Sequence, residues 1–148
     1  MNRFGLTFHH LALAIRDPKA AGVFLSGLGY SESETVYDPA QGVRLAMCTA
    51  PVHPSIELVS PADIAGPLDN LLKRDSERIY HLCYTSEDPA ASLEAMRAAG
   101  VRVMLVAPQK PAILFDGRPV SFYYVRGFGL IEIIHQEKNM EAIPHEAD

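Results

Sequence analysis

The feature that most constrains the fold is an internal repeat. Residues 10–20 recur 71 positions later as residues 81–91, with the His-Leu start, the Asp-Pro pair and the final alanine in register. Residues 56–58 (Ile-Glu-Leu) recur as 131–133 (Ile-Glu-Ile) at an offset of 75 positions. Each copy therefore begins with a histidine and ends with a glutamate. A repeat of this kind predicts two structurally equivalent modules that share one core.

Both copies carry the same local signals. A β-favouring apolar segment comes first, and the Asp-Pro pair after it is typical of a helix N-cap followed by the first helical residue. The alanine-rich segments that follow have helical periodicity and end at Gly29 and Gly100, which we interpret as left-handed C-caps. The predicted strands are residues 8–15, 31–37, 43–48 and 55–59 in the first copy and 78–85, 101–106, 120–125 and 130–134 in the second, and the predicted helices are 18–28 and 89–99.

The unit is thus β-α-β-β-β, twice, and the fold class is α+β. We expect a single domain over residues 1–148. It divides into a first module (8–60), a linker with a short helix (61–77), a second module (78–135) and a tail without assigned chemistry (136–148).

Composition narrows the function classes. The chain is 48% hydrophobic and 21% charged, which is typical of a globular domain whose core needs no disulfide or structural metal. The net charge of −5 argues against nucleic-acid and membrane partners. Apolar runs are strand-sized, and the two cysteines show no CxxC spacing, so we expect a soluble, cytoplasmic protein.

Strand alternation predicts where the repeated histidines point. The companions expected on their faces are mostly small, whereas the opposite faces are bulky, so the histidine faces are predicted to line a cavity. The expected companions are Phe8, Ala12 and Ala14 for His10 and Ile79, Cys83 and Thr85 for His81, and the opposite faces carry Leu11, Leu13, Ile15, Tyr80, Leu82 and Tyr84.

The repeated glutamates lie in apolar strands, where a buried carboxylate needs a counter-charge. If the modules are related by an approximate two-fold axis, His10, Glu57, His81 and Glu132 surround one point. Two imidazoles and two carboxylates suit one divalent transition metal (Mn, Fe, Co, Ni or Zn) better than calcium or magnesium. Taken singly, each residue is more simply a packed histidine or a solvent-facing glutamate, and it is the repetition that favours the metal.

The other histidines have no counterpart in the opposite copy. We interpret His9, His53, His135 and His145 as surface residues or as residues that support the ligands, and His9 is the nearest rival of His10.

These residues resemble the vicinal oxygen chelate (glyoxalase/bleomycin resistance/dioxygenase) superfamily over residues 8–135. The resemblance implies an open eight-stranded barrel around one divalent metal. Residues 66–74, followed by Ile-Tyr-His-Leu at 79–82, look most like methylmalonyl-CoA epimerases, as do 115–124 and 130–133. The ligand set is equally similar to that of bacterial glyoxalase I.

Two segments depart from the epimerase pattern. Some epimerases place an additional catalytic glutamate on the strand that corresponds to residues 43–48, which here has no carboxylate and carries Leu45 near the expected place. The loop at 125–129 also lacks the Asp-Pro turn of many members.

The resemblance predicts a metal-dependent epimerase or isomerase of a 2-substituted acyl thioester, acting through an enolate, with Glu57 or Glu132 serving as both ligand and base. Candidate handles for an anionic group of an acyl-CoA or a carrier-bound thioester are Arg44, Arg118, Arg126 and Lys110. The alternatives are a glyoxalase I-like lyase and a non-catalytic small-molecule binding protein, whereas four protein ligands disfavour an extradiol dioxygenase. Relatives often pair, so a homodimer is expected.

Overall fold

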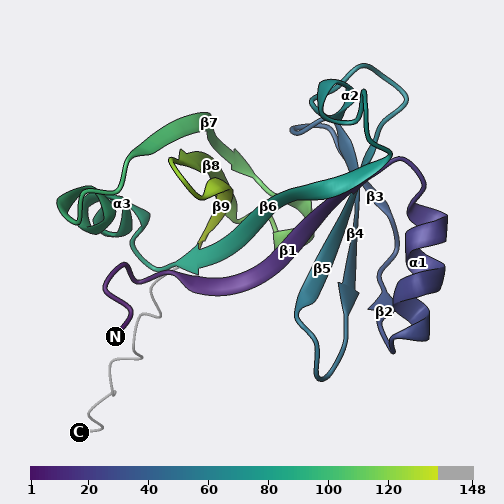
Figure 1. Cartoon of the computed structure of the whole chain (residues 1–148), viewed down its shortest axis with the longest axis horizontal. Coiled ribbons are helices and arrows are strands. Elements are labelled where there is room, and N and C mark those ends of the chain that lie inside the picture. The colour runs from purple at the N-terminus through teal and green to yellow at the C-terminus, as the bar shows by residue number, and fades with distance from the viewer. Residues whose placement is uncertain (137–148) are drawn as a thin grey trace, which may run out of the picture.

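All nine strands of the described chain join one curved sheet in the computed structural model, which describes residues 1–136 (Figure 1). Of the predicted tail, all but Gln136 lies outside the described residues, as does His145. The strands are β1 (Thr7–Ile15), β2 (Ser31–Glu32), β3 (Val36–Asp38), β4 (Val43–Thr49), β5 (Ser55–Pro61), β6 (Glu77–Ser86), β7 (Val103–Pro111), β8 (Pro119–Val125) and β9 (Gly129–His135). The helices are α1 (Pro18–Gly27), α2 (Leu68–Leu71), α3 (Pro89–Ala98) and the 3₁₀ helix η1 (Ile113–Phe115).

The sheet shows the predicted repeat in its strand order, which is β2-β4-β5-β1-β6-β9-β8-β7 with β3 also paired to β4. In each module the first strand runs parallel to the last, because β1 pairs with β5 and β6 pairs with β9. The first strands of the two modules pair antiparallel at the centre of the sheet. Figure 1 shows this central β1–β6 pair crossing the molecule between the two halves. The modules are therefore related by an approximate two-fold axis through that pair.

Both long helices begin and end as the sequence predicts. The Asp17 carboxylate accepts from the Ala20 N–H at 3.2 Å, and the equivalent bond joins Asp88 and Ala91 at 3.0 Å. At the other end each helix closes with a Schellman motif around a glycine of positive φ. In α3, for example, the amide of Gly100 donates to the carbonyl of Arg97.

The strand count differs from the eight that were expected, because the predicted strand at 31–37 is split into β2 and β3. The break occurs at Ser33. The hydroxyl of Ser33 accepts the hydrogen bond from the Met47 N–H at 2.9 Å, in place of a backbone carbonyl. The strand after Gly100 also starts two residues later than predicted, since the amide of Val101 is used by the helix cap.

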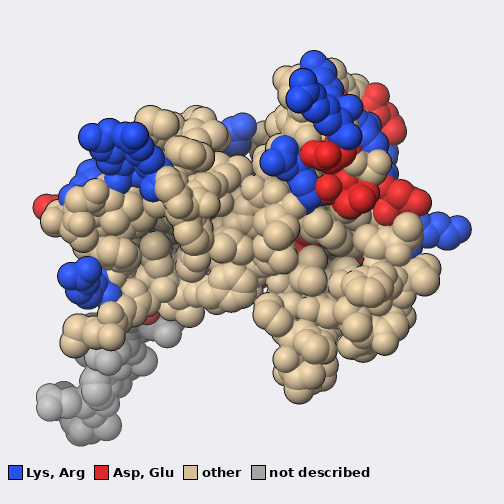
Figure 2. Space-filling model, in the orientation of Figure 1, with Lys and Arg blue, Asp and Glu red and all other residues tan. Residues whose placement is uncertain are grey.

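The two long helices, α1 and α3, cover the outer faces of the two modules. Leu13 and Ile15 pack with Leu25 of α1, and Tyr84 packs with the α3 side of the second module, as predicted. The inner faces form two further apolar clusters around the central strand pair. Charged side chains gather toward the two ends of the face shown in Figure 2, and most of the surface between them is uncharged. None of the helices in residues 1–136 is long and apolar enough to cross a membrane.

Candidate metal centre

The four repeated His and Glu side chains all lie on the inner face of the sheet. His10 and His81 come from the central strands β1 and β6, and Glu57 and Glu132 come from the parallel partners β5 and β9. Each of the four is at most 3% exposed. Leu58 of β5 points outward to the α1 cluster, as the alternation on either side of Glu57 requires.

The side chains approach one another in two pairs, one from each module. The Nε2 atom of His10 lies 3.8 Å from Oε2 of Glu57, and the Nε2 atom of His81 lies 3.9 Å from Oε2 of Glu132. The two imidazole ring centroids are 5.9 Å apart. Ligand atoms of His10, His81 and Glu132 all lie within 4.8 Å of one another. The structure therefore brings His10, His81 and Glu132 together as one group, and Glu57 adjoins that group through its approach to His10.

Three imidazole nitrogens of this cluster have no hydrogen-bond partner among the described residues, namely Nε2 of His10 and both ring nitrogens of His81. A buried polar group without a partner costs about 1–3 kcal/mol. Such a cost is tolerated at sites where another group completes the set of contacts.

Burial dominates the acid–base properties of the four groups. It lowers the pKa of His10 to about 4 and that of His81 to about 3. It raises the pKa of Glu57 to about 8, with a further contribution from the charge of Asp38, and the pKa of Glu132 to about 7, with a contribution from Glu57. The unliganded cluster is thus close to neutral at pH 7, and a cation would favour the ionised carboxylates.

The donor set and its spacing fit a divalent metal. Two atoms bound to one ion at about 2.1 Å each can be no more than about 4.2 Å apart, and both His–Glu pairs meet that limit. The unpartnered His10 Nε2 faces Glu57, and the unpartnered His81 Nε2 faces Glu132, so each module presents an imidazole nitrogen beside a carboxylate oxygen.

His10 and His81 are each preceded by a bulge in the central strand pair. The pairing register shifts between Phe8 and His10 in β1, and between Ile79 and His81 in β6. A bulge residue breaks strict alternation. The two extra residues, His9 and Tyr80, occupy equivalent places in the repeat.

These bulges correct three predictions about side-chain direction. Tyr80 was expected on the outer face, but it packs against the inner cluster with its ring 4.8 Å from that of His81. Phe8 and Ile79 were expected beside the histidines, but they are 46% and 65% exposed. The bulge also allows the His9 ring to face His10, with 2.8 Å between their Nδ1 atoms.

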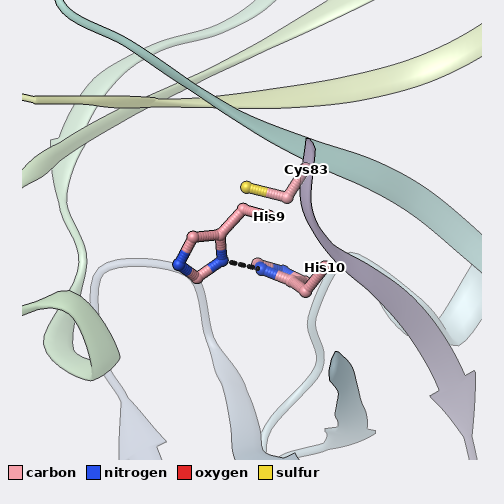
Figure 3. Close-up of side chains that lie close together, drawn as sticks. All are labelled: His9, His10 and Cys83. Carbon is pink, nitrogen blue, oxygen red and sulfur yellow. Dashed lines mark hydrogen bonds between the residues drawn. The ribbon is translucent and has the colours of Figure 1, made fainter. Parts of the chain in front are cut away.

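Aromatic rings enclose the two histidines. Phe115 of η1 stacks on His10 with ring centroids 5.6 Å apart, and Phe122 of β8 meets His81 edge-on at 5.1 Å. Figure 3 shows His9, His10 and Cys83 close together, with the His9 and His10 rings joined by their hydrogen bond. The Cys83 thiol lies 3.2 Å from Oε1 of Glu132, and burial raises the pKa of that thiol.

A third inward-facing carboxyl group, in addition to those of Glu57 and Glu132, was not predicted from the sequence. Asp38 of β3 is 1% exposed, and its Oδ1 accepts the N–H groups of Ala40 and Gln41 while its Oδ2 has no partner among the described residues. Residues 43–48 carry no carboxylate, and the buried one lies on the preceding strand, β3. The only available signal was alternation in the short strand β3, which pairs Asp38 with Val43.

A cavity of about 180 Å³ lies next to the cluster. Tyr80 and Phe122, whose rings both contact His81, form part of its wall. The remainder is mostly apolar, with Lys110 contributing a cation whose Nζ donates to the Ala40 carbonyl at 3.1 Å. The cavity adjoins His81 through Tyr80 and Phe122, but neither histidine lines it, so it differs from the cavity that was predicted along the histidine faces.

The predicted arginine handles have different surroundings. Arg44 forms an exposed ion pair with Asp63 at 2.7 Å, and it lines a different cavity from the one that contains the neighbouring residue Val43. Arg118 donates from Nε to the Phe115 carbonyl. The pKa of His9 is lowered mainly by burial, then by the neighbouring His10, and the charge of Arg118 makes a smaller contribution. Arg126 lines a surface groove of about 680 Å³ that also contains Arg97 and Arg102.

Comparisons with known proteins agree with this architecture. Residues 9–122 match the model of the glyoxalase/bleomycin resistance protein/dioxygenase superfamily. An ethylmalonyl-CoA/methylmalonyl-CoA epimerase of Cereibacter sphaeroides is 30% identical over 129 residues, covering 84% of this chain and 94% of the relative.

Solved structures show the same fold. Methylmalonyl-CoA epimerase from Mycobacterium tuberculosis superposes with a TM-score of 0.69 at 22% identity, over 90% of this chain and 89% of that one. A Streptomyces coelicolor methylmalonyl-CoA epimerase variant in complex with 2-nitronate-propionyl-CoA gives 0.66 at 22% identity, over 90% and 99%. With two β-α-β-β-β modules around a His–Glu cluster, a matching family model and a relative of this similarity, the chain belongs to the glyoxalase/bleomycin resistance protein/dioxygenase superfamily.

Proposed function

We propose that this protein is a metal-dependent epimerase of a 2-substituted acyl-CoA. The observation that carries the proposal is the convergence of two histidines and two glutamates, one pair from each module, on a single buried centre. The epimerase named for the C. sphaeroides relative supports the choice of reaction.

We assign His10, Glu57, His81 and Glu132 as the ligands of one divalent transition metal. Two imidazoles and two carboxylates favour Mn²⁺, Fe²⁺, Co²⁺, Ni²⁺ or Zn²⁺ over ions that prefer oxygen alone. When bound, such a cation supplies positive charge that stabilises negative charge developing on a thioester oxygen. Tyr80, Phe115 and Phe122 exclude water from the histidines and so strengthen electrostatic interactions within the centre.

Epimerisation requires a proton to leave one face of the α-carbon and another to arrive at the opposite face. Glu57 and Glu132 belong to different modules and approach different histidines, so they are suited to act from two sides. We assign one of them as the base that accepts the α-proton. In this role the carboxylate serves both as ligand and as proton acceptor.

The cavity beside His81 suits the acyl end of such a substrate. Its volume of about 180 Å³ is below the 300–1,000 Å³ of pockets that enclose a whole drug-sized ligand, so it accommodates only a small group. A 2-carboxyacyl group also needs a cationic partner. Lys110 at the cavity and Arg118 beside His9 and Phe115 are the cations placed for that role.

The nucleotide end of an acyl-CoA fits the groove at the end of β8. Tyr124 lies two residues beyond Phe122 on the same face, and Arg126 is about 13 Å from Phe122 along the chain direction. Arg97, Arg102 and Arg126 provide three cations in that groove, and Figure 2 shows few acidic atoms beside the basic group at the α3 end. We assign these arginines to the phosphate groups of the substrate.

Proton exchange tests the proposal. The protein reconstituted with Co²⁺ or Mn²⁺ and mixed with a single epimer of methylmalonyl-CoA in D₂O is expected to incorporate deuterium at the α-carbon and to form the other epimer. Glu57→Gln and Glu132→Gln should each reduce epimerisation, and the variant that lacks the base should lose exchange altogether. Full exchange by both variants would refute the role of the glutamates.

Two further arms separate the alternatives. A glyoxalase-type lyase shares this ligand set, and it would instead convert the methylglyoxal–glutathione adduct and leave methylmalonyl-CoA unchanged. A binding protein would retain the small molecule without exchange even when it is loaded with metal.

A further inference from the structure

The residue before the first ligand histidine is also a histidine, and the bulge in β1 aims both rings inward. His9 is half-buried, its ring meets Phe115 edge-on with centroids 5.4 Å apart, and its Nδ1 atom lies 2.8 Å from Nδ1 of His10. A strictly alternating strand would have placed the two rings on opposite faces. The bulge therefore creates a contact that the alternation of the sequence does not predict.

One interpretation of this contact is a second metal site formed by His9, His10 and Cys83, whose ligand atoms lie within 4.8 Å of one another (Figure 3). The distances argue against it. A site with a thiolate and imidazoles is typically tetrahedral, which places two nitrogens bound at about 2.05 Å roughly 3.3 Å apart. The observed 2.8 Å between the nitrogens is the length of a hydrogen bond. The Cys83 thiol is also engaged, since it donates to Oε1 of Glu132 at 3.2 Å.

The direction of the His9–His10 hydrogen bond follows from the other nitrogen of His10. That atom, Nε2, faces Oε2 of Glu57 at 3.8 Å and has no hydrogen-bond partner, so it is the ligand atom. A neutral imidazole that binds through the lone pair of Nε2 carries its proton on Nδ1. The Nδ1–H group of His10 then donates to the lone pair of His9 Nδ1, and the proton of His9 is on its own Nε2.

We propose that His9 is a positioning residue that fixes the tautomer and the ring orientation of His10, so that the Nε2 lone pair of His10 is held toward the metal centre. The inference rests on the ligand set in the proposed function. Metal-binding histidines usually donate their second N–H to a carboxylate or a carbonyl. In this chain the acceptor is another imidazole, which is supplied by the preceding residue.

Cys83 supports the second module in a corresponding way. By donating to Oε1 of Glu132, its thiol leaves Oε2 of that carboxylate free at 3.9 Å from Nε2 of His81. In each module one proposed ligand is thus hydrogen-bonded through the atom that does not face the centre, which is Nδ1 in His10 and Oε1 in Glu132.

The tautomer is measured directly in the parent protein without metal. Two-bond ¹H–¹⁵N correlation spectra of ¹⁵N-histidine-labelled protein near pH 8 report which ring nitrogen carries the proton. The proposal requires the proton of His10 on Nδ1 and the proton of His9 on Nε2. A proton on Nε2 of His10 overturns it, and this result depends on no variant.

Two substitutions of His9 test the consequence for metal binding. The Oδ1 atom of asparagine lies near the place of a histidine Nδ1, so His9→Asn keeps an acceptor, whereas His9→Phe keeps the ring and removes it. We expect His9→Phe to weaken Co²⁺ binding by about 10- to 100-fold and to produce a mixture of His10 tautomers. In His9→Asn, the Co²⁺ affinity and the tautomer of His10 should both be closer to those of the parent. His53→Phe is the control, because His53 is exposed and stacks on Tyr30 away from the centre.

These readouts use Co²⁺ titration and spectra, without substrate. If His9→Phe binds Co²⁺ as tightly as the parent, or if the asparagine variant is as weak as the phenylalanine variant, the positioning role is wrong. If the tautomer and the affinities behave as expected but no acyl-CoA exchanges its α-proton, the proposed function fails and the role of His9 remains supported.

Discussion

The individual side chains at this centre suit a bound cation better than they suit the metal-free protein. Burial, with a smaller contribution from the charge of Asp38, moves the pKa of Glu57 up to about 8, and burial, with a contribution from His10, moves the pKa of His81 down to about 3. The carboxyl groups resist ionisation and the imidazoles resist protonation. Without a metal, the centre therefore lacks the opposite charges that would let a glutamate and a histidine form an ion pair. Metal binding supplies the missing charge, and its affinity depends on removing the carboxyl protons.

The stability of the metal-free protein should therefore fall as the pH rises from about 6.5 to 8. The pKa of Glu57 is about 8 in the folded state, above the ordinary value of 4.5, so the folded state binds the proton more tightly than the unfolded state. Stability from this group is complete below pH 4.5 and is lost as the pH rises through 8. The histidines act oppositely but only below about pH 6.5, because their folded pKa values lie below the ordinary value.

Thermal unfolding of the chelator-treated protein at several pH values checks this expectation. Glu57→Gln removes the titrating group and should flatten the decline between pH 6.5 and 8. A parent protein whose unfolding temperature rises steadily over that range would contradict the sign.

Asp38 offers a second prediction at this scale. Asp38→Asn keeps an oxygen that can accept from Ala40 and Gln41 and removes a charge that opposes ionisation of Glu57, so its stability should stay within about 0.5 kcal/mol of the parent or exceed it. Asp38→Ala leaves those two N–H groups without an acceptor and should cost about 1–3 kcal/mol. Urea denaturation distinguishes the two variants, and equal losses would show that the charge, not the turn, is what matters.

At the scale of the element, the same signals operate in both modules. Each long helix starts with an aspartate cap and ends with a glycine in the left-handed region, with φ of 90° at Gly29 and 81° at Gly100. These caps decide where each helix stops, and in this way they fix where the following strands begin.

Replacement of the cap glycines should destabilise the protein. Gly29→Ala and Gly100→Ala force a side chain into a positive φ and are expected to cost about 1 kcal/mol each, although a new Cβ would meet nothing within 4 Å at either place. Gly27→Ala is the matched control, because Gly27 lies in α1 with the same open surroundings but without a positive φ. It should be neutral or stabilise by up to about 1 kcal/mol. Equal effects at Gly27 and Gly29 in chemical denaturation would contradict the cap assignment.

How much the sequence could predict follows from these local signals. Caps and the repeat predict the helices, the order of elements along each module and the inward direction of the four repeated side chains, because all of these depend on pattern alone. The inward turns of His9 and Tyr80 depend instead on bulges, which arise where the two central strands pair and leave no mark within either strand. Asp38 was missed for a related reason, since β3 exists only as a short partner of β4.

At the scale of the whole molecule, the two modules have different tasks around a shared centre. Each contributes one histidine and one glutamate, and the cavity wall is formed by side chains of both, including Val43 from the first and Phe122 from the second. The residues that line the groove containing Arg126 all belong to the second module. The substrate is therefore expected to extend from the shared centre along β8 toward α3.

Charge removal in that groove should act on binding rather than on chemistry. Arg126→Gln combined with Arg102→Gln is expected to raise KM for an acyl-CoA by about tenfold or more with little change in kcat, because the proposed function assigns these arginines to a part of the substrate that does not react. The same variant should process the corresponding acyl-pantetheine, which lacks the nucleotide, as well as the parent does. Arg74→Gln, near α2, serves as the control. A fall in kcat with unchanged KM would contradict this placement.

The central claim is that two like halves bring four side chains to one ion. X-ray diffraction from crystals grown with Co²⁺, measured on both sides of the cobalt absorption edge, tests it most directly. The account predicts one anomalous peak bonded at about 2.0–2.2 Å to His10, Glu57, His81 and Glu132. A peak elsewhere, or these four side chains turned away from one another around no peak, would contradict it.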